Sequence, residues 1–220
     1  DINASTAVTI DGPALTVADS ADGKPVLTLK TTHTTKTSSG ELQFLKDAAD
    51  TEDGEVLGQI TFYGEDEGNN NTAFAKIVAE ISESTHTDEA GKLSFYVAES
   101  DGTTTALTAG LTLTGQPTDD GEVDVTIGAG AASTTTVAGD LTVSGGDILV
   151  AGATPKITIG DAEAEDAMLA FDGIAQDFHI ALDDTADDLV IGVGTTAGTT
   201  TAIAINEAAQ VSVVDLFAAN

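Results

Sequence analysis

Four aspartates in the C-terminal third of the chain have a type and spacing that could do chemistry. Asp183, Asp184, Asp187 and Asp188 stand in the stretch FHIALDDTADDLVIGVGTT, between two apolar runs. Carboxylate oxygens are the ligands that Ca²⁺ prefers, so the cluster is a candidate metal site. The stretch lacks the D-x-[DN]-x-[DN]-G spacing of an EF-hand loop, and aspartate is also a common turn former. The pattern therefore favours an acidic hairpin turn, with a specific metal site as the alternative.

The three histidines are the remaining candidate metal ligands. His33 and His86 stand in Thr-rich polar stretches, whereas His179 alternates with Phe178 and Ile180. Nothing in their spacing brings them together, so we expect solvated or strand-face side chains rather than a metal site. Alternation places His179 on the face opposite to Phe178 and Ile180. In a trimer, copies of one histidine could meet on the axis.

No other motif indicates a cofactor or catalytic chemistry. The stretches GAGAAS and GVGTTAG lack the third glycine and the amphipathic helix of a dinucleotide-binding loop. Cysteine and tryptophan are absent, which excludes a thiol nucleophile, a zinc–thiolate site and tryptophan platforms for sugars. We expect a protein that is not an enzyme and has no cofactor, apart from adventitious Ca²⁺ on its acidic surface. A glycoside hydrolase with paired carboxylates is the catalytic alternative.

The charge of the chain excludes two classes of partner. The chain contains seven lysines and 37 acidic residues, which gives a formal net charge of −30. A nucleic-acid binder needs a basic face to neutralise phosphates, and an anionic membrane surface would repel this chain. No apolar run approaches the roughly 18 residues of a membrane span. The chain opens DINASTAV, and we expect it to be processed or part of a longer protein.

Alternation of apolar and polar residues with period two dominates the sequence and predicts an all-β fold. The acidic segments 47–55, 64–71 and 83–91 are expected to be turns or loops, with GEDEGNNN as a hairpin loop. Helix is an alternative only at 74–84, which also alternates like a strand, and at 163–170. The expected strands are the runs 26–29, 42–44, 60–62, 74–81, 93–97, 107–113, 141–143, 157–159, 178–182, 189–193, 203–205 and 211–213.

Short internal sequence repeats predict two regions made of similar small β units. GELQF, GQITF and GKLSF share the pattern Gly-x-apolar-x-Phe and define an N-terminal β region, 1–116. The remainder, 117–220, is expected to be a β-repeat shaft, with the boundary near Gln116 and Pro117. The apolar residues include much alanine and few aromatics, and small side chains bury little area. A single chain would therefore have a thin core, which favours a core shared with further copies.

Two long stretches resemble the β-rich repeats of tail-fibre and related virion proteins of phages, especially marine ones. They are GQITFYGEDEGNNNTAFAKIVAEISESTHTDEAGKLSFYV and KITIGDAEAEDAMLAFDGIAQDFHIALDDTADDLVIGVGTT, and VDVTIGAGAASTTTVAGDLTVSGGDI fits the same pattern. The resemblance implies an elongated, intertwined homotrimeric β fibre of short strands and acidic turns. It implies a structural role outside the cell, in a virion, next to other virion proteins. Host attachment would use a surface receptor, reached through a tip outside this chain.

Three other functions stay open. A prokaryotic surface adhesin, or a filament or S-layer subunit, would have a similar composition and would polymerise beyond three copies. A capsid decoration protein would be built from the same parts. A polysaccharide-degrading β-helix enzyme on a virion would require a specific pair of carboxylates.

Overall fold

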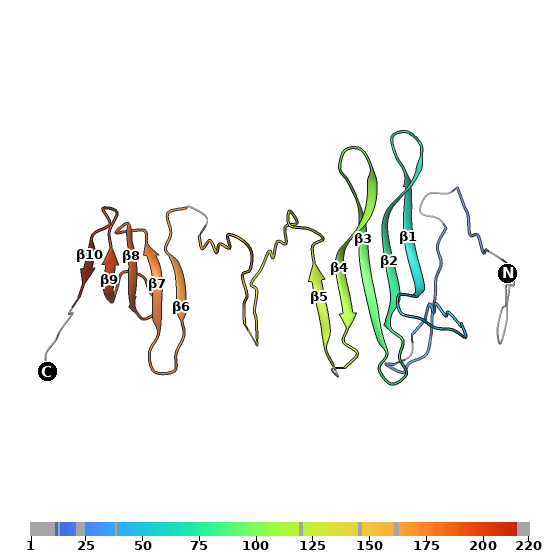
Figure 1. Ribbon diagram of the computed structural model, residues 1–220, viewed down its shortest axis with the longest axis horizontal. Helices are drawn as coiled ribbons and strands as arrows, with labels where there is room; N and C mark the ends of the chain where they lie inside the picture. The colour runs from blue at the N-terminus through green and yellow to red at the C-terminus, as the bar shows by residue number, and fades with distance from the viewer. Residues whose placement is uncertain are drawn as a thin grey trace. The chain divides into compact units, whose positions relative to one another are not determined.

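The computed structural model of the chain describes residues 12, 14–20, 25–37, 39–118, 121–144, 147–160 and 163–214. The described residues form ten β-strands and no α-helix, which confirms the all-β prediction (Figure 1). The strands make two five-stranded sheets in which neighbours in sequence are neighbours in space. Every pair is antiparallel, so each sheet is a simple meander.

The N-terminal sheet is built from strands whose turns are set by local hydrogen bonds. In the β1–β2 loop, predicted from GEDEGNNN, the Asp66 carboxylate accepts the N–H groups of Gly68 and Asn70. Asn69 takes the left-handed conformation there, with φ of 58°, as asparagine tolerates. The segment 74–84, for which helix was an alternative, lies almost wholly in β2. The strands are β1 (Val56–Glu65), β2 (Asn71–Glu83), β3 (Ala90–Ser100), β4 (Thr105–Gly115) and β5 (Val123–Ile127).

The C-terminal sheet has shorter strands and tighter connections. The helix alternative at 163–170 was wrong, because 167–170 lies in β6, where each residue pairs with a residue of β7. The β9–β10 turn is closed by Asn206, whose side-chain oxygen accepts the N–H groups of Ala208 and Gln210. The strands are β6 (Ala167–Phe171), β7 (Phe178–Asp183), β8 (Asp188–Val193), β9 (Thr201–Ile205) and β10 (Val211–Val213).

Each sheet carries two continuous rows of side chains, here called the apolar rows, that cross all five strands on one face. Strand pairing puts directly opposite residues on the same face, so the rows follow from the register. In the N-terminal sheet they are Ile60–Ile77–Phe95–Leu111–Ile127 and Gly58–Ala79–Leu93–Leu113–Val125. In the C-terminal sheet they are Leu169–Ile180–Ile191–Ile203–Val213 and Ala167–Leu182–Leu189–Ile205–Val211.

On the opposite, polar face of the N-terminal sheet, long side chains cover the shorter ones between them. Three consecutive cross-strand pairs join β2 to β3 there: Lys76 with Tyr96, Val78 with Ser94, and Glu80 with Lys92. The Lys76 ammonium lies 4.5 Å from the centre of the Tyr96 ring. The Lys92 ammonium lies 3.1 Å from a Glu80 carboxylate oxygen, although the two are not aligned as a hydrogen bond. The long side chains on either side leave the central Val78–Ser94 pair buried.

The chain divides into two compact units, 1–139 and 140–220. The division comes after the expected boundary at Gln116 and Pro117, because those residues only turn the chain between β4 and β5. β5 then pairs with β4 and completes the first sheet. Four expected strands, at 26–29, 42–44, 141–143 and 157–159, are not strands within the described part of the chain.

Candidate functional site

The aspartate cluster lies in the β7–β8 hairpin. Asp183 and Asp188 are directly opposite each other at the ends of the two strands. Asp184 and Asp187 belong to the connecting turn, where Asp187 has φ of 54°. One oxygen of Asp183 accepts the N–H of Ala186 at 3.3 Å. The hairpin turn predicted from the sequence is therefore confirmed, and two of the four carboxylates mark the strand ends.

A fifth carboxylate joins this cluster. Asp166, just before β6, accepts the backbone N–H of Asp184 at 3.0 Å. The sequence analysis missed it, and no local signal marks it, because only the β6–β7 pairing brings it to this hairpin. Among the described residues, no group of three or more His, Asp or Glu side chains is arranged to hold a metal ion.

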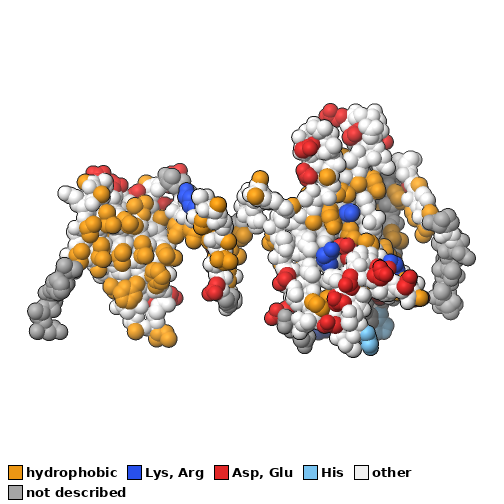
Figure 2. All heavy atoms as spheres, viewed as in Figure 1, with side chains coloured by type: hydrophobic (Ala, Val, Ile, Leu, Met, Phe, Trp, Pro, Cys, Tyr) orange, Lys and Arg blue, Asp and Glu red, His pale blue; other side chains and the backbone are white. Residues whose placement is uncertain are grey.

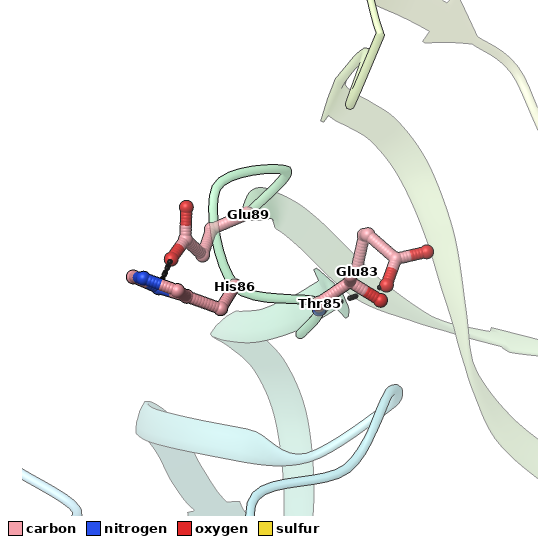
Figure 3. Close-up of polar contacts among 4 residues, drawn as sticks. All are labelled: Glu83, Thr85, His86 and Glu89. Atoms are coloured by element: carbon pink, nitrogen blue, oxygen red, sulfur yellow. Dashed lines mark hydrogen bonds and ion pairs between the residues drawn. The ribbon is translucent and has the colours of Figure 1, made fainter.

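Two of the histidines are exposed and lie in different elements. The ring Nδ1 of His33 accepts the N–H of Thr35 in the N-terminal segment. His86, in the β2–β3 loop, faces Glu89 with 3.4 Å between Nδ1 and a carboxylate oxygen (Figure 3). The N–H groups of Glu89 itself and of Thr87, and then His86, hold the pKa of the Glu89 carboxyl below its ordinary value. Such an exposed pair is worth little energetically.

The close-up of this loop shows two separate contacts rather than one site. Glu83 accepts the N–H of Thr85 at 2.9 Å, and it lies on the other side of the loop from the His86–Glu89 pair (Figure 3). A general acid at neutral pH needs a raised pKa. The lowered pKa of Glu89 is a shift in the opposite direction, so Glu89 itself does not have the electrostatics of a general acid.

His179 is the most buried side chain with a titratable group. It points away from Phe178 and Ile180, as alternation predicted, and of the two expected settings, solvated or on a strand face, it takes the second, with none of its side chain exposed. The loop 194–200 covers it, and its Nδ1 lies 2.9 Å from the carbonyl oxygen of Gly194. A carbonyl can only accept, so Nδ1 carries the proton. Nε2 has no partner among the described residues and faces Gly192.

Several hollows lie on the N-terminal sheet, and two of them contrast in their lining. One, of about 620 Å³, opens between the β2–β3 loop and the β4–β5 turn and is lined by polar residues including Asp88, Glu89 and Glu122. The other, of about 300 Å³, is apolar. It lies on the apolar face, where Phe44 packs so closely over Gly58 that a Cβ there would come within 2.7 Å of the Phe44 Cβ.

The apolar rows are the main functional candidate, because most of their large side chains are exposed in the single chain. Ile127 is 60% exposed, and Leu169, Ile180 and Ile191 are each 40% exposed or more. Figure 2 shows hydrophobic side chains gathered over the strands of the C-terminal sheet. The only buried apolar side chains among the described residues are Val78, Ala181 and Val190, and all three lie off the apolar rows. Large exposed apolar patches mark surfaces that bind other molecules.

Comparisons with protein-family models, curated proteins and solved structures found no match. Within the described residues, the structure also contains no helix suited to crossing a membrane.

Proposed function

We propose that this chain is a structural fibre protein of a phage virion, a homotrimer in which the apolar rows of three copies form a shared interior. The observation that carries the proposal is the contrast between these largely exposed rows and the three buried apolar side chains, Val78, Ala181 and Val190, of the described part of the chain. Each sheet is a single layer, and a sheet with an apolar face is stable when that face is covered.

The size of the apolar faces supports association between copies. On one face each row residue takes about 4.8 Å between strands and about 6.8 Å along its strand, so the four rows together offer roughly 650 Å² per chain. A stable protein interface needs about 800 Å² from each partner, and the rows supply most of that area. No Asp, Glu or Lys interrupts the rows, so copies would meet there without burying charge, despite the net charge of −30.

The distribution of charge also suits a fibre. Carboxylates such as Asp66, Asp101 and Asp184 lie in turns, where they stay solvated and oppose edge-to-edge aggregation of the sheets. The assignment to a virion, outside the cell and next to other virion proteins, is supported by the sequence resemblance. Host attachment through a receptor follows from the same resemblance. The proposed function requires no catalytic group or cofactor.

The test combines native mass with a matched pair of substitutions in β5. We expect light scattering in high salt to give three times the 22.1 kDa chain mass. Val125 lies in an apolar row and Thr126 on the opposite face, and both are exposed in the single chain. Val125→Asp is therefore expected to dissociate the trimer, whereas Thr126→Asp leaves it intact.

Other results would overturn the proposal in distinct ways. A monomeric wild-type chain, or two variants that behave alike, would show that the apolar rows are not a shared interior. A continuous distribution of masses would instead identify a polymerising filament subunit.

A further inference from the structure

A short segment before β1, here called the strap (residues 40–46), lies against the apolar face of the N-terminal sheet. It contains neither helix nor strand. Its Phe44 packs so closely over Gly58 that a Cβ on Gly58 would lie 2.7 Å from the Phe44 Cβ and 2.8 Å from its Cγ. Phe44 also lines the apolar hollow of about 300 Å³, together with five members of the apolar rows: Gly58, Ile60, Ile77, Ala79 and Leu93.

The strap and the strand beneath it are copies of one motif. GELQF (40–44) and GQITF (58–62) share the pattern Gly-x-apolar-x-Phe, but only the second copy is a strand. The last residue of the first copy, Phe44, fills the space above the first residue of the second, Gly58. Ala79 pairs with Gly58 in the same row. These two small side chains leave a recess in the apolar face that admits an aromatic ring.

Exposure along one apolar row differs between the end beside the strap and the opposite end. Ile60 in β1 and Ile127 in β5 end the same row, and both lie in edge strands. Ile60 is 40% exposed, whereas Ile127 is 60% exposed, as partial cover by the strap predicts. The rows offer roughly 650 Å², and a stable interface needs about 800 Å² from each partner. Assembly therefore needs the part of the face that the strap covers.

The contacts of the strap are weak. The Phe44 side chain is 51% exposed, and within the described residues no backbone hydrogen bond joins 40–46 to the sheet. The Lys46 Nζ lies 2.9 Å from Oε1 of Glu55, but the two side chains are 39% and 22% exposed, and exposed ion pairs contribute little. A segment held by so few buried contacts opens at a small cost in free energy.

We propose that the strap is an autoinhibitory cover, with Phe44 in the recess of the single chain until a second copy takes its place on the apolar row. The inference rests on the self-assembly described under Proposed function, and it adds a step that regulates this assembly. The strap and the second copy compete for one surface. The apparent affinity between copies is therefore reduced in proportion to the fraction of chains whose strap is open.

A matched pair of substitutions in the strap tests this competition. Light scattering of the full-length chain over a dilution series gives the concentration at which the assembly dissociates. Phe44→Ala removes the ring that closes the strap, so we expect that concentration to fall by about threefold or more. Leu45→Ala is the control, because the Leu45 side chain is 76% exposed, and it should leave the dissociation concentration unchanged.

A disulfide tests whether the strap must open. The chain contains no cysteine, so Phe44→Cys combined with Gly58→Cys provides a single pair of thiols. The two Cβ atoms of a disulfide lie about 3.8 Å apart, so a small shift of the strap accommodates the bond. Oxidation should raise the dissociation concentration by about tenfold or more. The reduced form of the same protein is the control.

Each outcome decides a different point. Tighter association of Phe44→Ala, together with weaker association of the oxidised double variant, supports the inference. An oxidised variant that assembles as well as its reduced form overturns the inference and leaves the proposed function standing. A Phe44→Ala variant that behaves like Leu45→Ala, or a disulfide that does not form, has the same consequence. Chains that stay monomeric in every variant, reduced or oxidised, overturn both proposals.

Discussion

Single residues on the covered face of the C-terminal sheet have little steric freedom. A Cβ on Gly192 would lie 2.7 Å from His179 Nε2 and 2.8 Å from the carbonyl oxygen of Thr200. Both neighbours are held in place, since the Nδ1 of His179 is bonded to Gly194 and Thr200 accepts the N–H of Val193. Glycine is therefore required here by close packing rather than by backbone conformation.

Gly192→Ala is expected to lower the free energy of unfolding by about 1–3 kcal/mol, the usual cost of overpacking. Gly110→Ala is the matched control, because Gly110 also lies in a strand and nothing stands within 4 Å of its added Cβ. That control should change the free energy of unfolding by less than about 1 kcal/mol. Thermal or denaturant unfolding of both variants provides the measurement. Equal changes in the free energy of unfolding of the two variants would mean that the ring of His179 moves aside without destabilising the protein.

At single residues, the local sequence predicted a turn but not the burial of a side chain. The turn at Asp183–Asp188 was predictable, because turn chemistry is contained in neighbouring residues. The burial of His179 was not, since the covering loop lies 15 residues further along the chain. A signal existed in the small residues Ala181 and Gly192, which lie on the same face and allow a loop to approach closely.

At the scale of elements, the hairpins depend on single carboxylates. In the β3–β4 turn, Asp101 accepts the N–H groups of Thr103 and Thr104, both at 2.8 Å. These bonds, Thr104 first, hold the pKa of the Asp101 carboxyl below its ordinary value of 3.8. Because the folded-state pKa is the lower one, the stabilisation is present above 3.8 and is lost as the pH falls through the folded-state pKa.

We therefore expect the Asp101 carboxyl to titrate below 3.8 when it is followed by NMR in the full-length chain. The amides of Thr103 and Thr104 should change in chemical shift with the same midpoint. In Asp101→Asn, which keeps an acceptor oxygen without the charge, that transition should vanish from both amides between about pH 2 and pH 5. A wild-type midpoint at or above 3.8 would show that the turn does not favour the ionised form.

Strand type was predictable for most elements, but strand pairing was not. The alternation at 178–182 and 189–193 became β7 and β8, because a tight turn lets consecutive strands pair at once. The triplets at 141–143 and 157–159 have the same local pattern and remain unpaired in the single chain. A ladder needs a second strand at the right distance, and a segment's own residues do not supply it.

At the scale of the whole molecule, repulsion between acidic residues lowers the free energy of unfolding when the ionic strength is low. The net charge of −30 makes the folded chain repel itself at low ionic strength. At roughly 0.5 M salt the screening length falls to about 4 Å, which is shorter than most distances between surface carboxylates. Salt is therefore expected to stabilise the folded protein.

The melting temperature should rise as NaCl increases from low concentration to about 0.5 M. Each 1 kcal/mol of repulsion removed corresponds to about 2–4 °C for a chain of this size. KCl at equal ionic strength should act alike if screening is the cause. A melting temperature that stays flat or falls would contradict the prediction, and a rise specific to one cation would indicate ion binding instead.

The sequence by itself determined the strand class, the acidic turns and the division of side chains between two faces. These follow from period-two alternation and turn-forming residues, which are properties of neighbouring residues. Only the tertiary structure decided which rows of side chains line up across five strands, that the first unit runs past Gln116, and that a loop covers His179. Each of these depends on register and on contacts between segments far apart in the chain, which local pattern does not encode.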